Sequence, residues 1–199
     1  MTSLSRHMTI APTSSPIDRT PPRPSSSVPK RPSHFFALRP ASGAIGEMRE
    51  ARDRPGFGGL PVRDEHLHFT LLWLGYDHPG TPALVASARE AAGTIEGSPL
   101  RIVFDKLVAA DNSLLLLPGD PLDHLHAFQR RLALALAAWG VRAERAWRFN
   151  PHVKLRRGPC AGRADAVDPI AWTAAEFVLI HSLPDPFRHE TADVWPLNR

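Results

Sequence analysis

The chain has 199 residues, enough for one domain of ordinary size or for two small lobes that share a cleft. Hydrophobic residues make up 43% and charged residues 22%, and no apolar run approaches the roughly 18 residues that a membrane span needs. We therefore expect a soluble globular protein with no membrane partner.

The positive charge is unevenly distributed along the chain. A formal net charge of +4 and a pI of about 10.0 would ordinarily indicate a nucleic-acid or membrane partner. Residues 1–33 contain five basic residues against Asp18 alone, so the rest of the chain is neutral overall. Any nucleic-acid binding by the folded part must therefore depend on a local cluster.

Residues 1–33 also hold seven of the 21 prolines, together with many serines. Such a composition buries too little apolar surface to offset the entropy of ordering, so we predict a disordered extension. The segment lacks the apolar core of a secretion signal, and its prolines would break the amphipathic helix of a transit peptide. We expect a monomer in the cytoplasm. The only cysteine, Cys160, excludes an intrachain disulfide but leaves a nucleophilic role open.

The folded part, residues 34–199, shows strands and helices in mixed order. An apolar run predicts a strand at residues 34–38, and a helix at 41–52 follows it. The run at 66–74 is aromatic and apolar and stops at Gly75, which makes it the clearest strand in the chain. Thr81 and Pro82 then provide a cap and a first-turn proline for an alanine-rich helix that ends near residue 92.

The second half of the chain repeats this pattern. Residues 100–107 and 113–117 predict paired strands with Asp111 and Asn112 in the turn, and apolar residues at helical spacing predict a helix at 120–139. Further strands are expected at 152–156, 176–181 and 188–195. The prediction is an α+β protein. Because strand, helix and histidine-bearing strand occur twice, we expect two similar lobes.

Two histidines lie in strands with polar residues at alternate positions. Since side chains alternate between the faces of a strand, His68 and Thr70 share one face. The same alternation groups His152 with Lys154 and Arg156. The intervening residues are apolar and are expected to face the core. They are Phe69, Leu71, Val153 and Leu155.

This pattern suits chemistry on a phosphodiester. Histidine transfers protons near neutral pH, and a hydroxyl or ammonium two residues further along can donate to a phosphoryl oxygen. Hydrolysis of a cyclic phosphodiester needs a base for water, an acid for the departing ribose oxygen and donors for the extra negative charge. No metal is strictly required. Either histidine alone could simply pack beside a strand end, and Thr70 could be present for its strand propensity.

Several segments resemble the 2′-5′ RNA ligase or RNA 2′,3′-cyclic phosphodiesterase family, within the two-histidine phosphoesterase superfamily. The resemblance covers about residues 34–197. Residues 68–75 (HFTLLWLG) are similar to the first signature of the family, and residues 149–155 (FNPHVKL) to the second. Residues 35–40 (FFALRP), 104–107 (FDKL), 176–182 (EFVLIHS) and 195–197 (WPL) resemble other family segments.

The resemblance implies a fold of two lobes with antiparallel sheets flanked by helices, related by a rough two-fold and separated by a V-shaped cleft. It implies hydrolysis of a 2′,3′-cyclic phosphate, at an RNA end or on a small nucleotide, to a 2′-phosphate without cofactor or metal. His68 would be the proton donor, His152 the proton acceptor, and Thr70 a ligand of a phosphate oxygen. The reverse reaction, 2′-5′ ligation of RNA, is left as a further possible activity.

Lys154 departs from the family pattern, which usually has threonine or serine there. Its charge can still contact phosphate and would depress the pKa of His152, although its length would shift the phosphate. The sequence therefore leaves open a non-catalytic RNA- or nucleotide-binding protein in which Lys154 alters the site. Lys154 could also be a surface residue without a role in the site. Arg157 matches an arginine that commonly follows the second motif. Strict alternation favours Arg156 at the site instead, unless a bulge or a strand end intervenes.

Three neighbouring features complete the candidate site. Seven basic residues lie between Arg142 and Arg163, which resembles an RNA-facing surface but could be a solvated face; Trp147 within it is expected in the core. A metal site of His66, His68 and His152 is an alternative, but no carboxylate accompanies it. His124 and His126 lie two apart on a helix and are expected at the surface.

Overall fold

The computed structural model describes residues 31–110, 112–160 and 163–198. The extension predicted to be disordered lies outside these residues apart from its last three, of which Ser33 begins the first strand. Among the described helices, none combines the length and the hydropathy that crossing a membrane would take.

The described residues form an α+β protein, as predicted from the sequence. In chain order the elements are β1 (Ser33–Leu38), α1 (Ser42–Arg52), β2 (Leu60–Pro61), the 3₁₀ helix η1 (Asp64–His66), β3 (Phe69–Tyr76), α2 (Thr81–Gly93), β4 (Leu100–Ala110), β5 (Ser113–Leu117), α3 (Asp123–Ala138), β6 (Val153–Arg157), β7 (Ala164–Ala174), β8 (Glu176–Pro184) and β9 (Phe187–Pro196). The three predicted helices are all present, with ends within three residues of those expected.

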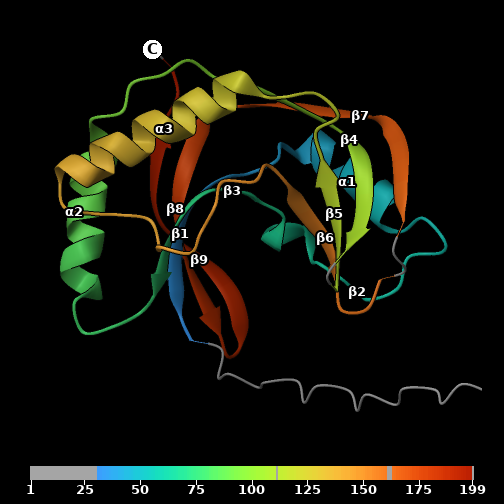
Figure 1. The fold of residues 1–199 in the computed structure, drawn as a ribbon, viewed down its shortest axis with the longest axis horizontal. Coiled ribbons are helices and arrows are strands. Elements are labelled where there is room, and N and C mark those ends of the chain that lie inside the picture. Colours follow the sequence, from blue (N-terminus) through green and yellow to red (C-terminus); the bar gives the residue numbers. More distant parts are fainter. Residues whose placement is uncertain (1–30, 111, 161–162, 199) are drawn as a thin grey trace, which may run out of the picture.

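The strands form one antiparallel sheet in the order β7-β4-β5-β6-β3-β1-β8-β9, with β2 paired to β6. β6 and β3 share a single residue pair, Phe69 with Val153, whereas the other neighbours pair more extensively. This junction divides the sheet into lobe A, with β1, β3, β8 and β9, and lobe B, with β2 and β4–β7. Figure 1 shows β1, β8 and β9 to the left and β4–β7 to the right.

The helices are exchanged between the lobes. α1 follows β1 of lobe A but packs against β6 and β7 of lobe B, on the right in Figure 1. α3 follows β5 of lobe B but packs against β3 and α2 in lobe A. The predicted recurrence of strand, helix and histidine-bearing strand is present as β1–α1–β3 and β5–α3–β6. Each lobe is therefore built from both halves of the sequence.

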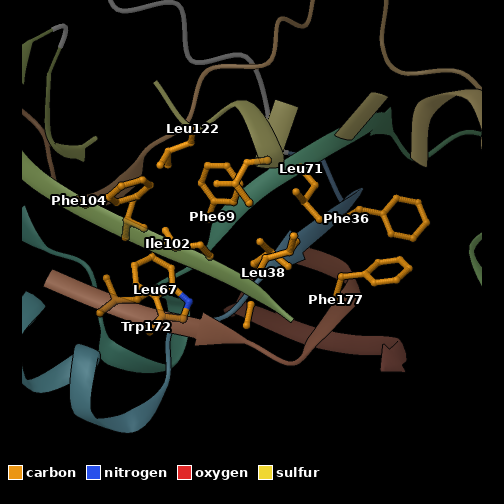
Figure 2. Close-up of a cluster of buried hydrophobic side chains, with 14 of the residues drawn as sticks. Phe36, Leu38, Leu67, Phe69, Leu71, Ile102, Phe104, Leu122, Trp172 and Phe177 are labelled. Carbon is orange, nitrogen blue, oxygen red and sulfur yellow. The ribbon is translucent and has the colours of Figure 1, made fainter. Parts of the chain in front are cut away.

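The alternation of faces predicted for the two histidine-bearing segments is confirmed on the core side. Phe69, Leu71, Val153 and Leu155 are fully buried. Figure 2 shows Phe69 beside Phe104, and the two rings meet edge to face at 5.9 Å between centroids. Burial of side chains of this size contributes about 1.5–3 kcal/mol each, so these residues fix which face the polar residues occupy.

Strand β7 was not predicted. Its interior contains Asp165, Asp168 and Pro169, which interrupt the apolar pattern expected of a strand. The strand pairs with β4 over most of its length and lies at the edge of the sheet. An edge strand tolerates proline because one side of its backbone needs no partner, so the local pattern was a poor guide.

The turn between β4 and β5 was predicted at Asp111 and Asn112. The two strands form the expected antiparallel hairpin. Asn112 has a φ of 62°, a left-handed conformation that asparagine tolerates better than most residues. Asp111 lies outside the described residues.

Candidate active site

A cavity of about 250 Å³ opens between the lobes where β3 meets β6. Five of the predicted site residues line it: His68, Thr70, His152, Lys154 and Arg157. The other lining residues are Phe35, Val62, His66, Ser182, Phe187 and His189. The structure therefore brings together residues that are more than 80 positions apart in the sequence.

The junction of the two lobes positions both motifs. Each histidine directly precedes its strand, and the first residues of these strands, Phe69 and Val153, pair with each other. Continuing this antiparallel register places His68 across from Lys154 and Thr70 across from His152. Each histidine thus lies near the polar donor supplied by the opposite strand.

The two imidazoles are oriented in the same way. Nδ1 of His68 lies 2.8 Å from the carbonyl oxygen of His66, and Nδ1 of His152 lies 2.8 Å from that of Asn150. A carbonyl oxygen can only accept a hydrogen bond, so Nδ1 carries a proton in both rings. In the neutral form of each histidine, Nε2 is then the basic nitrogen, available to accept a proton.

Burial lowers the pKa of both histidines, but to different extents. The pKa of His68 falls to about 4, chiefly because its ring is desolvated, and the charges of His152 and Lys154 lower it further. The pKa of His152 is lowered by burial first and by Lys154 second. The backbone hydrogen bond opposes the shift in each case. A negative charge between the rings would raise both pKa values.

The cavity favours anions. Lys154 and Arg157 line it, whereas none of its lining residues is acidic. Burial lowers the pKa of Lys154, with a smaller contribution from the nearby charge of Arg157, and burial likewise lowers the pKa of Arg157. The two cations are close enough to repel each other, and the cavity wall has no carboxylate to neutralise them. The cavity is therefore suited to bind an anion such as a phosphate.

Arg156 was predicted to bind substrate together with Arg157, but the structure places it elsewhere. Leu114 pairs with Arg156 and Leu115 pairs with Lys154, so Leu155 is an extra residue that forms a β-bulge in β6. The bulge reverses the alternation and turns Arg157, rather than Arg156, toward the cavity.

The guanidinium of Arg156 has a structural role. Its nitrogens donate to the carbonyl oxygens of Gly58, Arg52 and Gly59 at 2.8, 3.0 and 2.9 Å. These bonds tie β6 to the segment that connects α1 with β2. Of the two alternatives that the sequence left open, the structure therefore shows the bulge, which places Arg157 rather than Arg156 at the cavity.

The aromatic wall of the cavity was largely missed from the sequence. Phe35 lies 4.8 Å from His68 between ring centroids, and His189 lies 5.1 Å from His68 in an edge-to-face contact. Phe187 and His189 alternate on β9, which belongs to the same sheet as β1. Their spacing of two residues indicates a shared face, but nothing in the local sequence shows which strand that face adjoins.

A metal site of His66, His68 and His152 gains no support from the geometry. Within the described ranges, one group of three residues has potential ligand atoms within 4.8 Å of one another, and it is His34, Asp77 and His181. Those two imidazoles are stacked, with centroids 4.1 Å apart and planes 7° apart. Lone pairs in parallel stacked planes do not converge on one ion. Nδ1 of His34 and Nε2 of His181 instead lie 2.9 Å from the two different oxygens of the Asp77 carboxylate.

The remaining predictions concern residues outside the cavity. Arg142, Arg145 and Arg148 are exposed and do not line it. Trp147 is partly buried against the core, as expected. His124 and His126 are exposed, which confirms their predicted place at the surface. Cys160 lies outside the cavity, with Sγ 3.4 Å from the carbonyl oxygen of Gly58.

A two-lobed antiparallel sheet with paired histidines between the lobes defines a two-histidine phosphoesterase fold. Solved structures show the same fold at low sequence identity. A protein described as a phosphoesterase matches with a TM-score of 0.71 and 21% identity, over 85% of this chain and 100% of its own. LigT of E. coli, solved with 3′-AMP, matches with a TM-score of 0.70 and 21% identity over the same shares. TT0787 of Thermus thermophilus matches with a TM-score of 0.61 and 21% identity, over 83% of this chain and 97% of its own.

The sequence itself identifies the family. The sequence model of the 2′-5′ RNA ligase superfamily matches residues 38–183, which is most of the chain. The protein belongs to this superfamily, as the resemblance of its motifs indicated. A search of curated proteins finds no match.

Proposed function

We propose that the protein hydrolyses a 2′,3′-cyclic phosphodiester, at an RNA end or on a nucleotide, to a 2′-phosphomonoester. The observation that carries the proposal is the matched orientation of the two imidazoles, each held by a hydrogen bond from Nδ1 to a backbone carbonyl beside one cavity. Two such Nε2 atoms, one protonated and one basic, supply the acid and the base that this reaction needs, and the cations of the cavity stabilise the negative charge.

In the proposed mechanism, Nε2 of His152 accepts a proton from a water molecule, whose oxygen attacks phosphorus. The bond between phosphorus and the 3′ oxygen breaks while Nε2 of protonated His68 donates its proton to that oxygen. The products are a free 3′ hydroxyl and a 2′-phosphomonoester. Thr70 and Lys154 donate to the phosphoryl oxygens, on which negative charge accumulates in the transition state. No step requires a metal.

Protonation of His68 is the demanding part of this scheme, because its pKa is about 4 in the protein alone. The negative charge of a bound phosphodiester raises that pKa, since an anion stabilises the imidazolium. The substrate thereby helps to create the acid that cleaves it. His152 starts neutral, which its lowered pKa favours.

Ligands of structural relatives are consistent with the proposal. LigT of E. coli was solved with 3′-AMP, with ATP and with phosphate. These ligands carry phosphate groups, as the cationic cavity of the present chain would require. Reverse 2′-5′ ligation would use the same two histidines. The expected cytoplasmic location and monomeric state stay predictions.

The test is turnover of an oligonucleotide that ends in a 2′,3′-cyclic phosphate, measured in the presence of EDTA. The wild type is compared with His68→Ala, with His152→Ala and with His126→Ala, an exposed histidine outside the cavity. Loss of general acid or base catalysis costs roughly 10²–10⁴-fold, so the first two variants should lose activity and the third should not. Equal turnover by all four proteins would contradict the proposal.

A second candidate function is nucleotide binding without catalysis. The observation in its favour is Lys154, a cation in the cavity at a position where the family resemblance implies a neutral hydroxyl. A cation that binds the cyclic phosphate too far from the two imidazoles would give affinity without turnover. Tight binding of a cyclic nucleotide by a wild-type protein that does not hydrolyse it would favour this candidate.

A further inference from the structure

Phe187 lies at the contact between the lobes on one side of the cavity. It is the first residue of β9 in lobe A, and it is half-buried. The guanidinium carbon of Arg157, from β6 in lobe B, lies 4.3 Å from the centroid of its ring. The ring of His66 meets Phe187 edge to face at 4.7 Å between centroids. Phe187 therefore touches groups of both halves of the site: the half-site of lobe A, with His68 and its neighbours, and the half-site of lobe B, with His152, Lys154 and Arg157.

The Arg157 guanidinium lies over the face of the Phe187 ring. No salt bridge or side-chain hydrogen bond joins Arg157 to any other described residue. An arginine side chain without such contacts samples many rotamers, and ordering it on a ligand costs conformational entropy. A guanidinium stacked on an aromatic face is already held in one plane.

His66 extends the contact to the other half-site. Its carbonyl oxygen accepts the hydrogen bond from Nδ1 of His68, and its own ring is buried against Phe187. The Phe187 ring thus contacts both the cation of lobe B and the residue whose carbonyl oxygen orients the histidine of lobe A.

We propose that Phe187 is a positioning residue that holds Arg157 across the cleft as a preordered ligand for the substrate phosphate. The inference rests on the proposed function, since it takes the phosphate of the substrate to lie in this cavity. Arg157 makes the contact with the anion, and Phe187 acts through it. A phosphate then meets a guanidinium already in place, which raises affinity without adding a contact.

Phosphate affinity, measured without catalysis, tests the inference. The dissociation constants of inorganic phosphate and of a nucleoside 2′-monophosphate are determined by calorimetry at low ionic strength. Phe187→Leu keeps an apolar side chain but removes the ring, and we expect binding to weaken roughly 3- to 30-fold, the range of a cation–π contact. Phe187→Tyr keeps the ring and should stay within about twofold of the wild type. Phe187→Met serves as a second non-aromatic variant.

A double-mutant cycle separates positioning from general packing. Arg157→Gln should weaken binding, and adding Phe187→Leu to it should cause no further loss, because the two residues act as a unit. The matched control is Phe57→Leu, since Arg163 lies 4.5 Å over Phe57 in a second arginine–phenylalanine pair outside the cavity. It should leave phosphate affinity unchanged. Melting temperatures establish that each variant is folded.

Three results would overturn the inference: unchanged affinity in Phe187→Leu and Phe187→Met, an equal loss in Phe187→Tyr, or an equal loss when Arg157 is already replaced. Each can occur in a protein that still hydrolyses cyclic phosphates through its two histidines. Conversely, a protein that binds phosphate through Arg157 and Phe187 but turns over no cyclic phosphate would contradict only the proposed function. The two failures are therefore distinguishable.

Discussion

The half-sites of lobes A and B share one backbone hydrogen bond to the histidine and differ in the side chains around that histidine. In both, Nδ1 of the histidine donates to a carbonyl oxygen two residues earlier at 2.8 Å. Around His68 the neighbours are aromatic, with Phe35 and His189 in ring contact. The pKa of His152 is lowered by burial and, to a smaller extent, by the positive charge of Lys154. The orientation of the rings is symmetric, and their electrostatics are not.

In the proposed mechanism the two histidines serve opposite proton transfers. The aromatic wall desolvates His68 and makes its protonation depend strongly on a bound anion. His152, beside a cation, stays neutral and suits the acceptance of a proton. The backbone hydrogen bonds leave Nε2 as the basic nitrogen of both neutral rings. In the proposed mechanism the bound phosphate gives the direction of proton transfer, because it raises the lowered pKa of His68.

The largest expected effect comes from removing the histidines, singly and together. His68→Ala and His152→Ala should each lower kcat by roughly 10²–10⁴-fold. If the two half-sites work as one unit, the double variant should lose little more than either single variant, because an acid without its base is ineffective. Single-turnover rates on a cyclic nucleotide measure this. Losses that multiply in the double variant would mean that the histidines act independently.

A smaller effect is expected when the half-sites are made more alike by Lys154→Thr. Loss of a charged donor to phosphate should lower kcat/KM by roughly 10- to 100-fold. Removal of the positive charge should also raise the pKa of His152, since Lys154 now lowers it. Titration of the His152 ring protons by NMR measures the second effect. An unchanged or lower pKa would show that Lys154 does not act on His152 through its charge.

Replacement of the two neighbouring arginines of β6 should have different effects, since Arg156 contributes mainly to stability and Arg157 to phosphate binding. Arg156→Ala removes three hydrogen bonds to backbone carbonyls, so the free energy of unfolding should fall by about 2 kcal/mol. Arg157→Ala removes one ring contact and should cost about 1 kcal/mol or less in stability while weakening phosphate binding. Denaturant unfolding and calorimetry give the two quantities. Equal destabilisation by both variants would contradict the roles given to them.

Local pattern predicted the parts of the fold that depend on neighbours in sequence. The apolar alternation of Phe69 and Leu71 indicated the core face of β3, and helical spacing indicated α3. The exchange of helices between the lobes was not predictable, because it depends on packing between distant elements. β7 was missed because its polar residues and Pro169 interrupt the apolar pattern, and they are tolerated by an edge strand with an irregular register, which the sequence does not reveal.

Sequence-based prediction of the candidate site was limited in the same way, because single residues also depend on tertiary structure. His68, Thr70, His152 and Lys154 were predicted from alternation and motif, and all line one cavity. A single extra residue, Leu155, was enough to exchange the places of the two arginines that follow it. Phe187 reaches the site through the pairing of β9 with β8, which is set by tertiary structure.

The most direct test of opposite proton roles is the pH dependence of kcat/KM for the wild type and the two single variants. The pKa of His68 is about 4 and that of His152 is below 6.5, so wild-type kcat/KM, which reports the free enzyme, should be highest in acid below pH 6.5. It should fall at higher pH, because the protonated fraction of His68 keeps shrinking, and should fall again in stronger acid, because His152 gains a proton. The residual activity of His68→Ala should lose the decline at high pH, and that of His152→Ala the decline at low pH. The opposite assignment of the two declines, or both declines intact in both variants, would contradict the account.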